Sequence, residues 1–217
     1  MKANRQSLRG PRASGDIEGK LVTAAEDLMR SQGLARITTR DLAKKAGLAE
    51  GTLYNHFREK DEIFVSVLKR NVAELSHVLQ DLPLRVGQAT VLENLSPVAE
   101  AAIGFHVKVA PLICSLFADQ NLMSNIRRVM QERRIGPQRS LESLAAYISA
   151  EQRLGRVVSD VDAAAVAALI LGVSFQTAVF HHFWGNRTPE RELKAQMRKA
   201  IQATVLGLAP RDGRATK

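Results

Sequence analysis

Residues 37–60 read ITTRDLAKKAGLAEGTLYNHFREK, and this stretch decides the fold that we expect. Thr38 and Asp41 have the spacing of a capping box, in which a hydroxyl and a carboxylate satisfy free amides at a helix start. Gly47 then suits a sharp turn, and a second short helix is expected from about 50 to 57. Two short helices joined by a turn that contains glycine have the proportions of a helix-turn-helix, whose second helix enters the major groove of DNA.

The second helix of this pair carries an unusual set of outward side chains. Leu53 and Phe57 are four residues apart and would face the core. The outward positions would then be Glu50, Gly51, Thr52, Tyr54, Asn55 and His56. Hydroxyl, phenol, amide and imidazole groups can donate to phosphates or read base edges, and glycine lets the backbone come close. The alternative is a plain helical hairpin in a bundle, with Tyr54 and His56 half-buried.

Three further donors flank this helix. Lys60 would stand at the start of a fourth helix, where its ammonium and the free amides suit a phosphate. Thr39 and Arg40 open the first helix of the pair, which should cross the DNA backbone. A DNA surface here would therefore depend on a few well-placed groups, because residues 16–70 carry ten bases and nine acids.

Helices are also expected on both sides of this pair. Residues 17–32 have apolar side chains at helical spacing, and the pattern stops at Gly33, which suits a left-handed helix end with Leu34 folding back. Acids followed by a long apolar stripe predict one continuous fourth helix over 60–81, since the helix dipole favours acids near a helix start. Leu82-Pro83-Leu84 would end that helix, and we place a domain boundary there.

Strand signals are nearly absent from the chain, so the expected fold class is all-α. Six further helices are expected at about 90–108, 111–118, 120–134, 138–154, 161–184 and 189–207. Pro97 falls inside the first of them and would either kink it or mark a restart. The expected organisation is a basic arm over 1–15, a helix-turn-helix domain over 16–82 and a helical domain over 83–217.

Composition and charge restrict the class of protein further. The 217 residues are 45% hydrophobic and 24% charged, which is enough apolar material for a buried core. The net charge is +9, and residues 1–15 hold four bases and no acid, so this arm is either a DNA-contacting arm or a solubilising tail. A single cysteine fits a reducing cytosol, and no export signal or membrane span is expected. We therefore expect a cytoplasmic protein.

The helix expected at 161–184 has small residues first and bulky aromatic residues later. A helix that is apolar nearly all round must be buried on several sides, so it needs a partner beyond its own domain. With Leu144, Tyr147 and Ile148 of the helix at 138–154, it would form a four-helix bundle between two copies of the chain. The alternative is the central core helix of a monomer.

A set of apolar side chains with a few polar groups would line an effector pocket if the C-terminal helices enclose one. Its members are Phe105, His106, Cys114, Phe117, Met123, Ile126, Tyr147, Phe175 and Gln176. Such a lining favours a hydrophobic or aromatic effector. The alternative for most of these residues is ordinary core packing.

Catalytic and metal chemistry find little support in the sequence. The five histidines form no spaced set with cysteine or with one another that would ligate a metal. Cys114 and His106 could be a thiol and its base, but no loop or helix start activates the thiol. The glycine motifs that bind nucleotide phosphates are missing as well. We expect no enzyme, no cofactor and no metal site.

The blocks ITTRDLA over 37–43, AGL over 46–48 and GTLYNHF over 51–57, followed by Lys60, resemble the N-terminal signature of the TetR family of transcriptional regulators. The resemblance covers about residues 17–70. It implies a homodimer whose paired helices bind a DNA operator of two half-sites. It also implies a C-terminal helical domain, which dimerises and binds a small effector. The long helix expected over 60–81 would link this domain to the three-helix headpiece.

The resemblance also implies roles for single residues. Phosphates would be held by Thr39, Tyr54, His56 and Lys60, and bases would be faced by Glu50, Thr52 and Asn55. Glu50 is ambiguous, because its carboxylate could accept from a cytosine N4 amine or could simply repel phosphate. Ala49 departs from the family, which often has a capping Ser or Thr at this position.

The predicted function is a ligand-responsive transcriptional regulator, and proteins similar to this one are usually repressors. Two rivals remain at this point. One is an architectural DNA-binding protein without an effector. The other is a helical small-molecule-binding protein or enzyme that keeps the headpiece as a scaffold.

Overall fold

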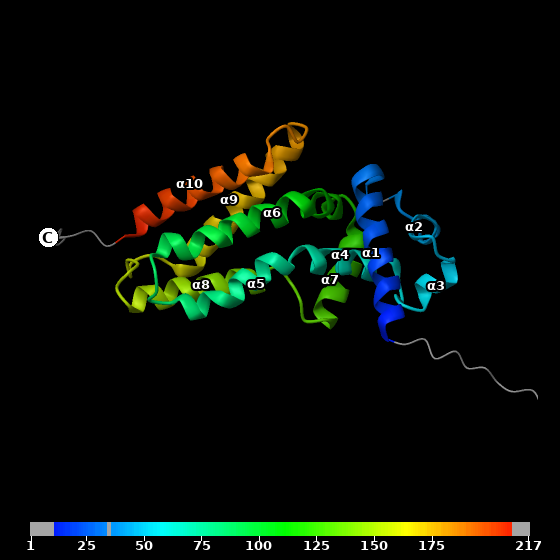
Figure 1. Cartoon of the computed structure of the whole chain (residues 1–217), viewed down its shortest axis with the longest axis horizontal. Coiled ribbons are helices and arrows are strands. Elements are labelled where there is room, and N and C mark those ends of the chain that lie inside the picture. Colours follow the sequence, from blue (N-terminus) through cyan, green and yellow to red (C-terminus); the bar gives the residue numbers. More distant parts are fainter. Residues whose placement is uncertain (1–10, 34–35, 210–217) are drawn as a thin grey trace, which may run out of the picture. The chain divides into compact units, whose positions relative to one another are not determined.

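The computed structural model describes residues 11–33 and 36–209, and every regular element in these ranges is a helix (Figure 1). In chain order the elements are α1 (Pro11–Gln32), α2 (Thr39–Ala46), α3 (Glu50–Tyr54), α4 (Lys60–Asn71), α5 (Ala73–Asp81), the 3-10 helix η2 (Leu82–Arg85), α6 (Val91–Phe117), α7 (Gln120–Glu132), α8 (Gln138–Arg153), α9 (Ala163–Phe183) and α10 (Glu190–Leu208). The all-α fold class is confirmed.

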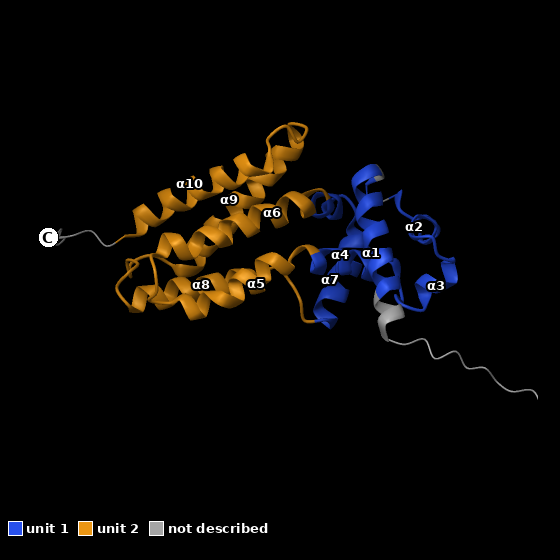
Figure 2. Cartoon of the chain, in the orientation of Figure 1, with its two compact units in different colours: residues 1–70, 112–133 blue, residues 71–111, 134–217 orange. Residues whose placement is uncertain are grey.

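The chain folds into two compact units (Figure 2). Unit 1 consists of residues 1–70 and 112–133, and unit 2 of residues 71–111 and 134–217. This division by packing differs from the domain boundary expected near residue 82, because α7 and the end of α6 pack with α1 to α4. The functional boundary itself stays a prediction.

The start of the chain also differs in detail from expectation. Helix α1 begins at Pro11, inside the stretch expected to be a basic arm. The remainder of that arm, residues 1–10, lies outside the described residues, as does the contact expected of Leu34. Gly33 has a φ of 76°, the left-handed conformation expected at the end of the first helix.

The long fourth helix expected over 60–81 is wrong as a single element. The helix is interrupted at Val72, which separates α4 from α5. The two pieces belong to different units: α4 buries Phe64 and Val65 in unit 1, whereas Leu75 and Leu79 of α5 join the core of unit 2. The apolar stripe continues across the break, which is why the sequence pattern does not reveal it.

The separation of helices expected at Pro111 is also wrong, because α6 runs through both Pro97 and Pro111. Proline has no N–H for the carbonyl four residues earlier, which at Pro111 is the carbonyl of Val107. His182 Nε2 of α9 lies 2.6 Å from that oxygen and donates to it. A side chain thus replaces the missing bond, and the helix continues.

The core of unit 2 is built chiefly from α5, α6, α8, α9 and α10, with α8 and α9 in close contact. Leu144, Tyr147 and Ile148 of α8 are 2% exposed or less and belong to this core. Their expected place in a bundle between two chains is therefore wrong, since helical spacing shows that they share a face but not what that face meets. Helices α6 and α9 are long and apolar enough to cross a membrane, a test that the core helices of soluble proteins also pass.

Candidate nucleic-acid interface

Helix α2 of unit 1 begins as predicted. The Asp41 N–H donates to Thr38 Oγ1 at 3.1 Å, and the Thr38 N–H donates to Asp41 Oδ2 at 3.0 Å. The Thr38 hydroxyl also donates to Asp41 Oδ2 at 2.6 Å, and the bonds that this carboxyl accepts from the hydroxyl and amide of Thr38 hold its pKa below the ordinary value. Gly47 ends the helix with a φ of 68°, which most side chains avoid. The capping box and the glycine turn are confirmed.

Helix α3 rests on a buried apolar edge and turns its polar groups outward. Leu53 is 0% exposed and Phe57 2%, whereas Tyr54 is 54% exposed. Gly51 and Asn55 are also exposed, and Thr52 and His56 are half-buried. The helix ends at Tyr54, sooner than expected, but the Phe57 N–H still donates to the Leu53 carbonyl at 2.9 Å and keeps the next turn folded. Ala49 provides no side-chain cap.

The start of α2 and the start of α3 are joined by side chains. The Thr39 hydroxyl donates to Glu50 Oε1 at 2.7 Å, and Arg40 Nε lies 3.9 Å from Glu50 Oε2. The Tyr54 hydroxyl donates to Thr39 Oγ1 at 3.5 Å. The structure therefore links four of the predicted DNA-binding residues, Thr39, Arg40, Glu50 and Tyr54, in one network of side chains.

Lys60 is held at the opposite end of α3, at the start of α4. Its Nζ donates to the Ile37 carbonyl at 2.9 Å and lies 5.8 Å from the centre of the Phe64 ring. An ammonium has three donors, so two remain for another acceptor. The bond to Ile37 fixes where that ammonium lies relative to α2.

Side chains of α7 and of Arg133, which follows it, form ion pairs and a hydrogen bond with residues at the start of α4. The sequence did not predict these contacts. Arg128 pairs with Glu59, Arg133 lies 3.2 Å from Glu62, and Asn125 donates to Asp61 at 2.9 Å. The hydrogen bond to Glu59 raises the pKa of the Arg128 guanidinium above its ordinary value. The only sequence signal for this contact is opposite charge: acids at 59–62 and an arginine-rich run from 127. These bonds connect α7 to the segment that follows α3.

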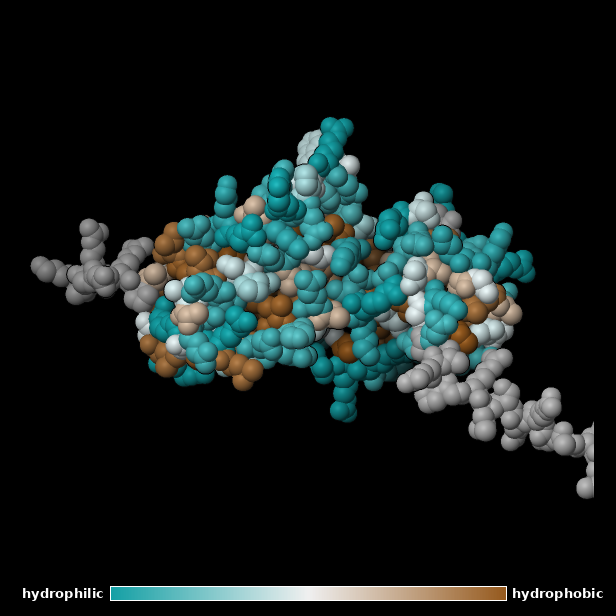
Figure 3. All heavy atoms as spheres, viewed as in Figure 1, coloured by the Kyte–Doolittle hydropathy of each residue, from teal (hydrophilic) through white to brown (hydrophobic). Residues whose placement is uncertain are grey.

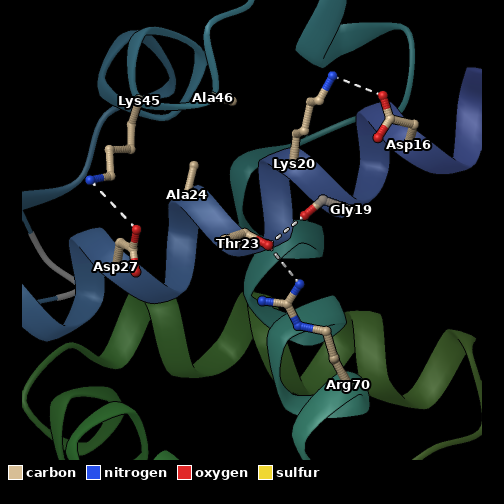
Figure 4. A pocket seen from close by; sticks show the side chains of 9 residues that line it. All are labelled: Asp16, Gly19, Lys20, Thr23, Ala24, Asp27, Lys45, Ala46 and Arg70. Atoms are coloured by element: carbon tan, nitrogen blue, oxygen red, sulfur yellow. Dashed lines mark hydrogen bonds and ion pairs between the residues drawn. The ribbon is translucent and has the colours of Figure 1, made fainter.

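A polar groove in unit 1 lies between α1, the end of α2 and Arg70 of α4 (Figure 4). Lys20 pairs with Asp16 at 2.8 Å, and Lys45 lies 3.5 Å from Asp27 across the groove. Arg70 donates to the Thr23 hydroxyl at 3.0 Å. The groove is lined by none of the predicted effector residues, and its charges largely satisfy one another.

Three of the predicted effector residues come together in unit 2. The His106 ring centre lies 5.1 Å from that of Phe105 and 5.5 Å from that of Phe175. His106 Nδ1 is 2.7 Å from Ser174 Oγ, and the Ser174 hydroxyl donates to the Leu171 carbonyl at 2.8 Å. Because that hydroxyl proton is used, Nδ1 must be the donor, and Nε2 carries a lone pair. Burial lowers the pKa of His106 to about 4, so the ring is neutral at pH 7.

The remaining predicted effector residues are dispersed. Tyr147 is buried in a separate polar network, where its hydroxyl accepts from Asn94 Nδ2 at 3.0 Å, and burial raises its pKa. Gln176 is exposed on α9. Four others belong to unit 1: Cys114 and Phe117 are exposed, Met123 is half-buried and Ile126 is buried. Within the described residues, no group of three metal-ligating side chains is found.

A capped helix, a glycine turn and a short helix with exposed polar groups define a class of protein, the helix-turn-helix DNA-binding regulators. Residues 21–67 match a family model described as bacterial regulatory proteins, tetR family. This segment therefore carries the N-terminal domain that the tetR family model describes.

Known proteins resemble the chain well beyond this headpiece. Rv2250c of Mycobacterium tuberculosis, an uncharacterized HTH-type transcriptional regulator, is 28% identical over 164 residues, which are 75% of this chain and 80% of that protein. A TetR-family regulator of Mesorhizobium loti has the same fold with a TM-score of 0.68 at 20% identity, over 91% of this chain and 98% of the other. FadR of Bacillus subtilis, solved in complex with stearoyl-CoA, has a TM-score of 0.67 at 18% identity, over 88% of this chain and 98% of that chain.

Proposed function

We propose that this protein is a cytoplasmic repressor that binds a two-half-site operator as a homodimer and releases it when a small hydrophobic effector binds. The observation that carries the proposal is the orientation of α3. Its apolar residues Leu53 and Phe57 are buried, while Tyr54 and Asn55 are exposed. A merely structural hairpin would not need exposed phenol and amide groups on a two-turn segment. We assign no catalytic role, cofactor or metal to any residue.

The proposed contacts divide into two classes. One class would contact phosphates and so position the helix. It consists of Thr39 and Arg40 at the start of α2, Lys60 at the start of α4, and Tyr54 and His56. Glu50, Thr52 and Asn55 would face base edges in the major groove, and Gly51 would let the backbone come close. Phosphate contacts strengthen binding to every sequence, whereas base contacts distinguish one sequence from another.

This division predicts two different mutant phenotypes. Lys60→Ala should weaken binding about equally on all duplexes and reduce the slope of log K against log salt by about 1. Asn55→Ala should weaken binding to the preferred sequence by roughly tenfold or more and leave binding to mixed-sequence DNA nearly unchanged. The measurement is fluorescence anisotropy with a duplex from beside the coding region and a mixed-sequence duplex of equal length, over a salt series. Equal losses on both duplexes for both variants would contradict the division.

The dimer proposal rests on an exposed apolar stripe along α9. Exposed residues recur at three- and four-residue spacing on one side of the helix: Ala165, Ala168, Leu169, Gly172, Gln176, Phe180 and Phe183. All but Gln176 are apolar or small, and Phe183 is 74% exposed. Hydrophobic residues also gather in patches among hydrophilic ones on the face of unit 2 seen in Figure 3. A second copy of this helix is the partner that we propose for the stripe, with the exposed side of α8 beside it.

The effector proposal rests on the ring cluster in unit 2. Phe105 and Phe175 offer apolar faces, and His106 offers one acceptor, Nε2, because its Nδ1 is committed to Ser174. We therefore propose an effector that is largely apolar and carries one hydrogen-bond donor. The stearoyl-CoA complex of FadR, a protein of similar fold, is consistent with an apolar ligand.

The effector would act by binding one conformation of the dimer more tightly than the other. Within unit 1, the contacts of α7 with Glu59, Asp61 and Glu62 hold the segment that follows α3, where such a shift would have to alter the DNA-binding residues. An apolar compound with a single donor should lower the operator affinity of the wild-type protein. An operator affinity that responds to no small molecule would favour the architectural alternative.

A further inference from the structure

We propose that Glu50 occupies the place of a DNA phosphate in the free protein and thereby suppresses binding to DNA of arbitrary sequence. This inference rests on the DNA-binding function proposed above and adds a specificity device to it. It is carried by the contacts of the Glu50 carboxylate with Thr39 and Arg40. These two groups begin the helix that should cross the DNA backbone.

The hydroxyl of Thr39 has only one proton to donate. In this structure the proton goes to Glu50 Oε1 at 2.7 Å, so the hydroxyl cannot donate to a phosphate at the same time. Arg40 is different, because its side chain is 86% exposed and its Nε is 3.9 Å from the carboxylate. A pair so exposed is weak, and Arg40 can turn to a phosphate without a large loss. Glu50 therefore keeps the Thr39 hydroxyl, but not Arg40, from donating to a DNA phosphate.

The charge of Glu50 acts in the same direction. A duplex presents one negative charge per about 1.7 Å of its axis, and binding to arbitrary sequences depends on how many of these charges the protein neutralises. A carboxylate beside Arg40 and Thr39 repels the phosphates and offsets part of one positive charge. Every DNA sequence meets this repulsion.

Only some sequences can compensate for it. If Glu50 turns from Thr39 toward the major groove, its carboxylate can accept from the N4 amine of a cytosine. Thr39 is then released and can donate to a phosphate. The same residue would disfavour all sequences and favour those with a suitable donor at one position, which is discrimination by repulsion as well as by attraction.

The test compares Glu50→Gln with a matched control, Glu18→Gln. Both changes remove one negative charge from unit 1, and the amide oxygen of a glutamine at position 50 is a weaker acceptor for the Thr39 hydroxyl than the carboxylate. Glu18 is exposed on α1 and lines a groove with Lys69 and Arg133, away from the contacts of Glu50. Circular dichroism and thermal unfolding would establish that both variants keep the fold.

Binding is measured by anisotropy on a mixed-sequence duplex of about 30 base pairs between 50 and 200 mM KCl. Relative to Glu18→Gln, we expect Glu50→Gln to bind this duplex about five- to tenfold tighter, with a salt slope steeper by about 1. Selection from a randomised duplex pool should also show that a cytosine enriched by the wild-type protein is no longer enriched by Glu50→Gln. Equal affinities for the two variants, or weaker binding by Glu50→Gln on every duplex, would overturn the inference. A wild-type protein that enriches no sequence from the pool would instead refute the proposed function, whatever Glu50→Gln does.

Discussion

Replacing Glu151 with alanine is expected to lower the free energy of unfolding by about 2 kcal/mol, because it removes a buried carboxylate that pairs with the half-buried Arg156 and accepts from the backbone of Gly87. Glu151 lies on α8 and is 0% exposed. Its Oε1 accepts from the Gly87 N–H at 3.2 Å, and its Oε2 lies 3.3 Å from Arg156 Nε. Arg156 also donates to the Ala89 carbonyl, so the loop between η2 and α6 is fastened to α8 through this pair.

Urea unfolding at one fixed protein concentration measures this loss. The matched control is Glu142→Ala on the exposed side of the same helix, which should change the stability by no more than about 0.5 kcal/mol. Glu151→Gln retains an acceptor for Gly87 and should fall between the two. If the free energies of unfolding of Glu151→Ala and Glu142→Ala differ by less than about 1 kcal/mol, the contacts of Glu151 with Arg156 and Gly87 do not stabilise the loop.

The second large effect is expected from charges on the exposed stripe of α9. The double variant Leu169→Glu, Phe180→Glu places two carboxylates where we propose that two copies of the chain meet. Leu169 and Phe180 are each 54% exposed and stand eleven residues apart, close to three helical turns, so they share one side of α9. Burying these carboxylates without partners is unfavourable, and the dimer should dissociate.

Loss of the dimer should lower operator affinity at least 100-fold, because two linked headpieces gain that much from binding both half-sites together. Light scattering should give the mass of one chain, 23.8 kDa, for the variant and twice that mass for the wild type. Leu206→Glu is the matched control, since Leu206 is 71% exposed on α10, off the stripe. A variant that remains dimeric, or a monomer that binds the operator as tightly as the wild type, would contradict this arrangement.

Local chemistry explains which parts of the fold could be predicted from the sequence. The capping box of Thr38 and Asp41 and the left-handed Gly47 depend only on neighbouring residues, and both were predictable. The break at Val72 was not, because the apolar spacing continues across it while the two halves pack in different units. The expectation at Pro111 was wrong for a similar reason: the Val107 carbonyl that Pro111 leaves without an N–H accepts from His182, 71 positions later in the chain than Pro111.

The candidate site shows the same limit. Helical spacing was sufficient to separate the buried Leu53 from the exposed Tyr54, because spacing fixes which residues share a face. It could not show that the Thr39 hydroxyl donates to Glu50, since that contact depends on how α2 and α3 meet around Gly47. Nor could it show that Arg128 of α7 pairs with Glu59, because the two residues lie far apart in the chain.

The central claim is that two copies of α3 enter neighbouring major grooves of one duplex. Hydroxyl-radical footprinting of the wild-type protein, on DNA that it has selected from a randomised pool, tests this most directly. The account predicts two protected stretches whose centres lie about 34–36 Å apart along one side of the duplex, or a multiple of that distance. A single protected stretch, or uniform protection without a repeat, would contradict it.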